Sequence, residues 1–277
     1  MNHLCALLTT ARPRFWLYLA GPVLVGLAFG IDSFGRLTDL EVVALLVYFL
    51  IPANLYLYGV NDIFDASIDQ LNPKKAGRER RFTGDRVIVG GVIVSLLLGL
   101  ALLIILPRAI QPWLLGFFFL ATAYSVPPIR FKVRPLFDSI SNGLYILPGV
   151  AAYVLVAEVL PPTEVIVGAW LWTMAMHTYS AIPDIVPDRA GGIRTTATIL
   201  GKHGALAYCG IIWMLAAIAF GVVDLRAGLL LSVYPMLVIL VAVSPTSVRR
   251  AYWAYPVINT IVGMVFVIAG FWEVTHG

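Results

Sequence analysis

Nine apolar runs recur along this chain of 277 residues, and most of them are long enough to cross a lipid bilayer as helices. The chain is 60% hydrophobic and 12% charged, with a mean hydropathy of +0.89, which excludes an ordinary soluble domain. The pattern predicts an all-α polytopic membrane protein with nine transmembrane helices, eight being the alternative count, in one integral membrane domain over residues 1–277. The runs lie near residues 15–31, 41–61, 87–107, 112–126, 139–157, 164–182, 205–223, 228–243 and 252–272.

Basic residues are distributed unevenly between the two sides that these nine runs define. Of 19 lysines and arginines, 16 fall on the side of the N-terminus, and only Arg36, Arg108 and Arg226 fall on the other. Positive charge is retained on the cytoplasmic side of membrane proteins. We therefore expect a multi-pass protein of the cell membrane, with a cytoplasmic N-terminus and an outside C-terminus. The net charge of +4 is then mostly a topology signal, and a nucleic-acid partner is not expected.

Two acidic clusters stand at the predicted cytoplasmic ends of apolar helices. The first falls at helical positions i, i+3 and i+7 with an asparagine at i−1, and the second at i and i+4, so each lines one face. Carboxylates this close repel one another unless they share a cation, and an all-oxygen set suits a hard ion such as Mg²⁺. The sequence therefore predicts a site for a metal diphosphate. Its members are Asn61, Asp62, Asp65 and Asp69 in the first cluster and Asp184 and Asp188 in the second.

Polar stripes lead from both clusters into the predicted membrane region. Asn54 and Tyr58 continue the face of the first cluster, and His177 continues that of the second. Polar side chains inside apolar helices are costly and often functional. The alternative interpretation is that Asn54 and His177 form hydrogen bonds between helices.

Basic residues between the two clusters offer further charge for a leaving diphosphate. Arg130, Lys132 and Arg134 follow a helix end on the same predicted side. Positive groups stabilise the negative charge that develops on a departing group. Arg130 and Lys132 are candidate diphosphate ligands, whereas Arg134 is interpreted as a topological anchor.

Motifs of several other chemistries are absent from the sequence. No GxxxxGK(S/T) phosphate loop, dinucleotide fingerprint, Gx(S/T)xG elbow or HExxH pair is present. Metal-assisted ionisation of a lipid diphosphate is then the chemistry that the charged residues favour.

The two motifs together resemble those of the UbiA superfamily of intramembrane prenyltransferases. Residues 61–69 match NDxxDxxxD, and residues 184–201 match DxxxDR, GxRT and LG in order. The resemblance implies a helical bundle around a central cavity with a cytoplasmic cap, in which two Mg²⁺ ions bridge the acidic motifs and a prenyl diphosphate. It implies Asn61 and the five aspartates as metal ligands, Asp65, Asp184 and Lys132 as catalytic residues, and Asn61, Arg130 and Lys132 as diphosphate contacts.

Two further groups of residues are assigned with this family in view. Arg78 is taken as another diphosphate contact, although residues 72–82 depart from the Arg-Pro-Leu turn that many members carry there. The allylic cation left by the diphosphate must be shielded from water, and aromatic rings stabilise cations. The candidates for this acceptor and cation cavity are Asn54, Tyr58, Tyr124, Tyr145, His177 and Tyr179.

The amino-acid sequences of three segments resemble those of the carotenoid-modifying branch of the family, the lycopene elongases. These segments are residues 12–16, 72–75 and 175–185. The resemblance implies that dimethylallyl diphosphate donates a five-carbon unit to the ends of a C40 carotenoid acceptor. The acceptor alkene is left as a tertiary cation that must lose a proton or capture water, so a base or a placed water is required. His177 is our hypothesis for the residue that orients it.

Two alternatives remain at this point. Within the family, the acceptor is instead an aromatic quinone, haem or chlorophyll precursor, or a glycerolipid. In another class, the protein is a cation-coupled transporter, although such proteins place charges near the membrane midplane on broken helices.

Overall fold

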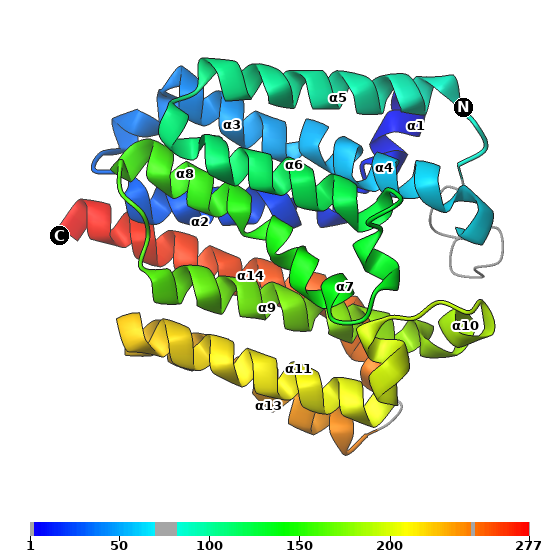
Figure 1. Ribbon diagram of the computed structural model, residues 1–277. Coiled ribbons are helices and arrows are strands. Elements are labelled where there is room, and N and C mark those ends of the chain that lie inside the picture. Colours follow the sequence, from blue (N-terminus) through cyan, green and yellow to red (C-terminus); the bar gives the residue numbers. More distant parts are fainter. Residues whose placement is uncertain (1–2, 70–81, 245–246, 277) are drawn as a thin grey trace. The chain divides into compact units, whose positions relative to one another are not determined.

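The computed structural model describes residues 3–69, 82–244 and 247–276. All regular elements in these ranges are helices (Figure 1). The side chains of residues 67–69, 247 and 249 are outside the description. The chain divides into two compact units, the first comprising residues 1–129, 147–159 and 267–277 and the second residues 130–146 and 160–266.

The first unit is a layered packing of long apolar helices. Within it α2 packs against α3 and α8, and α4 packs against α3, α5 and α6 (Figure 1). The crossing of α2 and α8 depends on small residues, since a Cβ atom on Gly26 would lie 2.1 Å from the carbonyl oxygen of Gly149. The helices are α1 (His3–Thr10), α2 (Leu17–Gly30), α3 (Leu40–Leu50), α4 (Pro52–Asp69), α5 (Arg86–Ile105), α6 (Gln111–Ser125) and α8 (Leu147–Ala157), with the end of α14 (Ser247–His276).

The second unit is built around α11, which packs against α9, α12 and α13. Its centre is an aromatic cluster, in which the ring centroids of Tyr179 and Tyr255 are 4.6 Å apart and those of Trp213 and Tyr234 are 5.3 Å apart. These four side chains are almost completely buried. The helices are α7 (Phe137–Ile140), α9 (Thr163–Ala181), α10 (Ile185–Ala190), α11 (Thr196–Val223), α12 (Leu225–Leu231), α13 (Val233–Ala242) and the first part of α14.

Every one of the nine predicted runs is helical, but the number of membrane spans is not confirmed. In the described part of the chain, six helical stretches are long and apolar enough to cross a membrane, and the bent pair His3–Phe15 and Leu17–Gly30 would make a seventh. The six are Leu40–Ala66, Arg86–Ile105, Phe137–Ala157, Thr196–Val223, Leu225–Ala242 and Arg250–His276.

The two remaining runs, 112–126 and 164–182, do not have the length or the hydropathy of a membrane span, for different physical reasons. Helix α6 has 15 residues, fewer than the approximately 20 that a bilayer requires. Helix α9 has 19 residues, but polar positions such as Glu164, His177 and Thr178 lower its hydropathy. The structure also describes no cytoplasmic cap, because residues 70–81 lie outside the described ranges.

Candidate active site

The first acidic motif lies on the last turns of α4, where this helix leaves its apolar stretch. Asp62 and Asp65 are buried, with 4% and 7% of their surface exposed. The amide nitrogen of Asn61 donates a hydrogen bond of 3.1 Å to the hydroxyl of Ser125, the last residue of α6. Buried carboxylates at the negative end of a helix dipole require positive charge nearby. Asp69 ends α4, but its side chain, like the whole of Arg78, lies outside the described residues.

Arg12 provides positive charge to this motif from the N-terminal segment. Its guanidinium Nη2 donates to Oδ1 of Asp62 at 2.8 Å, and its Cζ lies 4.7 Å from the centroid of the Tyr58 ring. Arg12 has a left-handed backbone, with φ 51° and ψ 73°. A residue without the freedom of glycine adopts this conformation at a cost of about 1–3 kcal/mol, so the surrounding contacts must hold it there. We infer that Arg12 orients the carboxylate of Asp62 through Oδ1.

Replacing Arg12 by glutamine is expected to lower the free energy of unfolding by about 1.5–3 kcal/mol, the usual value of a hydrogen bond to a charged group. The physical reason is that buried Asp62 loses the guanidinium from one oxygen. Unfolding of the purified protein in detergent measures the effect. Arg14→Gln is the matched control, because Arg14 is exposed on the same segment. Equal, small losses in the two variants would show that the Arg12–Asp62 pair contributes little.

The polar residues that precede the first motif on α4 are buried, and their contacts are defined. Asn54 is fully buried, and its amide nitrogen donates to the carbonyl oxygens of Phe49 and Leu50, each at 3.0 Å. These bonds hold the break between α3 and α4, which agrees with the interpretation of Asn54 as a structural residue. Tyr58 is buried beneath Arg12, and Tyr124 is partly exposed on the last turn of α6. Their roles beside a cation stay predictions.

The second acidic motif does not lie at the end of one continuous helix, although this was predicted. Helix α9 ends at Ala181, a 3₁₀ turn covers Ile182–Asp184, and Asp188 lies on the separate helix α10. Pro183 within the turn explains the break, because proline supplies no backbone N–H to continue the hydrogen-bond ladder. Both aspartates are partly exposed. The next residue, Arg189, donates through Nε to the carbonyl oxygen of Thr198 at 3.0 Å, and so ties the motif to the first turn of α11.

The basic segment that precedes α7 belongs to the same unit as the second motif. Arg130 has a left-handed backbone, with φ 44° and ψ 60°, and the 3₁₀ turn Phe131–Val133 follows it. Strained backbone of this kind is often found at functional sites. Lys132 has a buried Nζ although the residue as a whole is partly exposed. The arrangement favours a function for both residues over simple anchoring in the lipid interface.

Two predicted cavity tyrosines of the second unit occupy different environments. Tyr179 is completely buried in the aromatic cluster, between Trp213 and Tyr255. It therefore packs the core of the unit. Tyr145 is partly exposed at the end of the 3₁₀ helix Ser141–Tyr145. A cavity role for either tyrosine remains a prediction.

The donor chemistry of both motifs fits a hard divalent cation. Asn61, Asp62 and Asp65 offer only oxygen ligands once the amide oxygen of Asn61 is counted, and so do Asp184 and Asp188. Mg²⁺ binds through one or two carboxylates together with substrate phosphates and water. Among the described side chains, no group of three or more His, Cys, Asp or Glu residues is placed to hold a metal ion.

Two residues near the acidic motifs were not predicted as members of the site. Arg12 was considered only as one of the basic residues on the N-terminal side and as part of segment 12–16, although it contacts the first motif. Asp138 was not among the predicted site residues, and it is fully buried and hydrogen-bonded to Thr196 in the same unit as the second motif. The signal for Asp138 was present, because an aspartate within an apolar run is rare.

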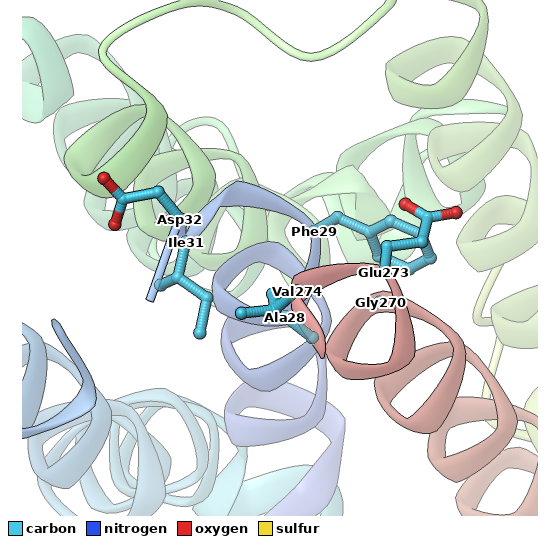
Figure 2. A pocket seen from close by; sticks show the side chains of 7 residues that line it. All are labelled: Ala28, Phe29, Ile31, Asp32, Gly270, Glu273 and Val274. Atoms are coloured by element: carbon cyan, nitrogen blue, oxygen red, sulfur yellow. The ribbon is translucent and has the colours of Figure 1, made fainter. Parts of the chain in front are cut away.

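A pocket of about 260 Å³ lies in the first unit at the ends of α2 and α14 (Figure 2). Asp32 and Glu273 stand at its two sides. None of its lining residues was a predicted site residue, and the acidic motifs do not contribute to it. Its lining is Ala28, Phe29, Ile31, Asp32, Gly270, Glu273 and Val274.

Comparison with known proteins defines the class to which this fold and these motifs belong. The UbiA prenyltransferase family matches residues 19–273. The chain therefore belongs to this family and is a prenyltransferase integral to the membrane. The resemblance that the acidic motifs indicated is thus confirmed, and the transporter alternative is not supported.

Two relatives of this chain are lycopene elongase/hydratases from haloarchaea. The enzyme of Haloferax volcanii is 55% identical over 276 residues, which cover 100% of this chain and 92% of the relative. That of Halobacterium salinarum is 54% identical over 272 residues, covering 98% of each chain. Among solved structures, a UbiA homolog from Archaeoglobus fulgidus bound to GPP and Mg²⁺ has a TM-score of 0.76 at 22% identity, covering 97% of this chain and 99% of that one. The structural similarity shows a shared fold.

Proposed function

We propose that this prenyltransferase transfers a dimethylallyl group from its diphosphate to the ends of a C40 carotenoid such as lycopene, in a Mg²⁺-dependent reaction. The observation that carries the proposal is the 55% identity over the whole chain to a lycopene elongase/hydratase. The three segments that resemble the lycopene elongase branch support the same acceptor. Since the family match extends over both compact units, we treat residues 1–277 as one functional domain.

The donor is held by the acidic motifs and the basic residues between them. The UbiA homolog of Archaeoglobus fulgidus has also been solved bound to DMAPP and Mg²⁺, which supports this donor and this metal. Two Mg²⁺ ions, when bound, neutralise charge on the diphosphate that leaves. The residues assigned to the metals are Asn61, Asp62, Asp65, Asp69, Asp184 and Asp188, and those assigned to the diphosphate are Asn61, Arg78, Arg130 and Lys132.

The reaction proceeds through two carbocations. The C–O bond of the donor breaks, its electron pair leaves with the diphosphate, and Lys132 and Arg130 balance the new charge. The terminal alkene of the carotenoid attacks the allylic cation with its π electrons, which forms a C–C bond and a tertiary cation. Water adds to this second cation and gives up a proton to His177, in keeping with the hydratase activity named for the relatives. Tyr58, Tyr124, Tyr145 and Tyr179 are the aromatic side chains assigned to the allylic cation, and Asn54 is assigned to the acceptor cavity.

The site is assigned to the cytoplasmic side of the cell membrane. The support is the distribution of basic residues, 16 of 19 of which fall on the side that holds both acidic motifs. The N-terminus is then cytoplasmic and the C-terminus outside.

Replacing His177 by alanine is expected to redirect the product. The tertiary cation loses its base, so the fraction of hydrated carotenoid falls by about 10²-fold or more, the usual contribution of a general base. Binding of the diphosphate donor is expected to survive, because His177 precedes Asp184 by seven residues. Product analysis by mass spectrometry and donor titration measure the two effects. An unchanged product and rate would remove His177 from the mechanism.

The acceptor assignment is tested by a direct comparison of substrates. Purified protein is incubated with Mg²⁺ and dimethylallyl diphosphate, and with lycopene, an aromatic quinone precursor or a glycerolipid. Extension of lycopene is the expected result. Extension of only the aromatic or glycerolipid acceptor would overturn the carotenoid assignment and leave the prenyltransferase assignment intact.

A further inference from the structure

Ser125 places a buried hydroxyl at the end of α6, next to the first acidic motif. Only 1% of its surface is exposed, and its oxygen accepts a hydrogen bond of 3.1 Å from the amide nitrogen of Asn61. Asn61 is the first residue of the motif on α4, and both residues belong to the first unit. The hydroxyl therefore contacts the amide of a residue that is assigned to Mg²⁺.

The hydroxyl of Ser125 is used differently from the other hydroxyl on this part of α6. Thr122 donates to the carbonyl oxygen of Phe118, four residues back, at 2.6 Å, which is a usual local bond of a hydroxyl within a helix. Among the described residues, Ser125 makes no such bond to its own helix, and its oxygen accepts from Asn61. The contact with α4 therefore accounts for a polar side chain at this buried position.

The packing of α4 against α6 has other contacts that do not involve Ser125. The hydroxyl oxygens of Tyr56 and Thr122 are 2.6 Å apart. Because Thr122 gives its own proton to Phe118, Tyr56 is the donor of this bond. The rings of Tyr56 and Phe118 also pack edge to face, with their centroids 5.7 Å apart. These contacts join the two helices about one turn before Ser125, so the bond to Asn61 is additional and determines the orientation of the amide.

The two ends of the Asn61 amide have different chemistry. The nitrogen donates to Ser125, whereas the oxygen Oδ1 has no hydrogen bond to any of the described residues. An amide oxygen is a suitable ligand for Mg²⁺, and an amide nitrogen, which carries two protons, is not. A hydrogen-bond partner behind a metal ligand fixes its orientation and makes the ligand atom more basic. The bond to Ser125 therefore selects the oxygen as the end of Asn61 that is available to a cation.

We propose that Ser125 is the positioning residue for Asn61 in the Mg²⁺ site, an inference that rests on the proposed function. Ser125 holds the amide nitrogen and contacts neither the metal nor the donor. The oxygen of Asn61 is then the atom that is offered to the cation. Without the hydroxyl, the amide rotates about its last torsion and presents nitrogen as readily as oxygen. The consequence is weaker binding of Mg²⁺ by a protein that keeps its fold.

The test measures binding of Mg²⁺ by calorimetry to the purified protein in detergent, with the unreactive analogue dimethylallyl thiolodiphosphate present. Ser125→Ala is expected to raise the Kd for Mg²⁺ about 10- to 100-fold, the usual effect of removing a hydrogen-bond partner of a metal ligand. Ser125→Thr keeps the hydroxyl, so its Kd is expected to stay well below that of Ser125→Ala. Thr122→Val is the matched control, because it removes the neighbouring hydroxyl of α6 and its bond to Tyr56. We expect this control to lower the melting temperature and to leave the Kd unchanged.

Two further variants separate the outcomes. The double variant Asn61→Ala/Ser125→Ala is expected to bind Mg²⁺ as Asn61→Ala does, because residues that act as a unit are not additive. Ser125→Cys, whose sulfur is only a weak acceptor, replaces Ser125→Ala should the latter not fold, with a rise in Kd expected again. Wild-type affinity in a folded variant without the hydroxyl would overturn the inference, and so would an equal rise in Thr122→Val. A wild-type protein that binds no Mg²⁺ beside the donor analogue would instead overturn the proposed function.

Discussion

Replacing Asp65 by asparagine is expected to reduce the rate of prenyl transfer by about 10³-fold. A loss of this size is usual when one group that stabilises a charged transition state is removed. Asp65 is buried on α4 about one turn after Asp62. Its carboxylate is one of those assigned to Mg²⁺, so its replacement is expected to weaken metal binding. Transfer of radiolabel from the donor to lycopene measures the loss, and titration of Mg²⁺ by calorimetry shows whether metal binding is weakened with it.

The matched control for Asp65→Asn is Asp39→Asn in the same unit. Asp39 is exposed and pairs with Arg36 in the segment before α3, so its replacement removes one carboxylate without touching the motif. Wild-type transfer is expected for this control. An Asp65→Asn variant that transfers label at the wild-type rate would show that the first motif does not bind the donor.

Methionine in place of Lys132 is expected to lower the rate of transfer by about 10²-fold or more, because the leaving diphosphate loses a cation from a site where water is scarce. The Nζ of Lys132 is buried, which strengthens its electrostatic effect. Lys132→Arg keeps the charge and should recover part of the activity. Single-turnover release of diphosphate measures the chemical step apart from binding.

Arg226→Met is the matched control for Lys132→Met. Arg226 is an exposed cation of the same unit in the first turn of α12, where it pairs with Asp224. Its loss should leave the rate unchanged. A Lys132→Met variant that releases diphosphate as fast as this control would assign Lys132 to interfacial anchoring.

Much of the secondary structure could be predicted from hydropathy, whereas the predicted number of nine spans is not confirmed. Each of the nine apolar runs is helical, since apolar residues in lipid must satisfy their backbone hydrogen bonds within the segment. The described helices include six or seven stretches able to span. The difference arises at α6, which is short, and at α9, which carries His177 and its polar neighbours.

Local spacing predicted the acidic residues but not the side chains that support them. Asp62 and Asp65 were recognisable because carboxylates are rare at the ends of apolar helices. The partner of Asp62 lies fifty positions away in sequence, and no periodic pattern connects them. The same holds for Asp138 and Thr196, which are brought together by packing. Tyr179 shows the opposite case, since its assignment to the cation cavity did not reveal its burial beside Trp213 and Tyr255.

The measurement that tests the central claim most directly follows both substrates at once. The purified protein in lipid vesicles receives dimethylallyl diphosphate labelled in its carbon chain, lycopene, an aromatic quinone precursor and Mg²⁺ in ¹⁸O-water. The account predicts that the label moves to lycopene in five-carbon steps, that each added unit brings one oxygen from water, and that both changes stop when a chelator removes Mg²⁺. Donor hydrolysis that leaves lycopene unlabelled, or label found only on the aromatic acceptor, would contradict it.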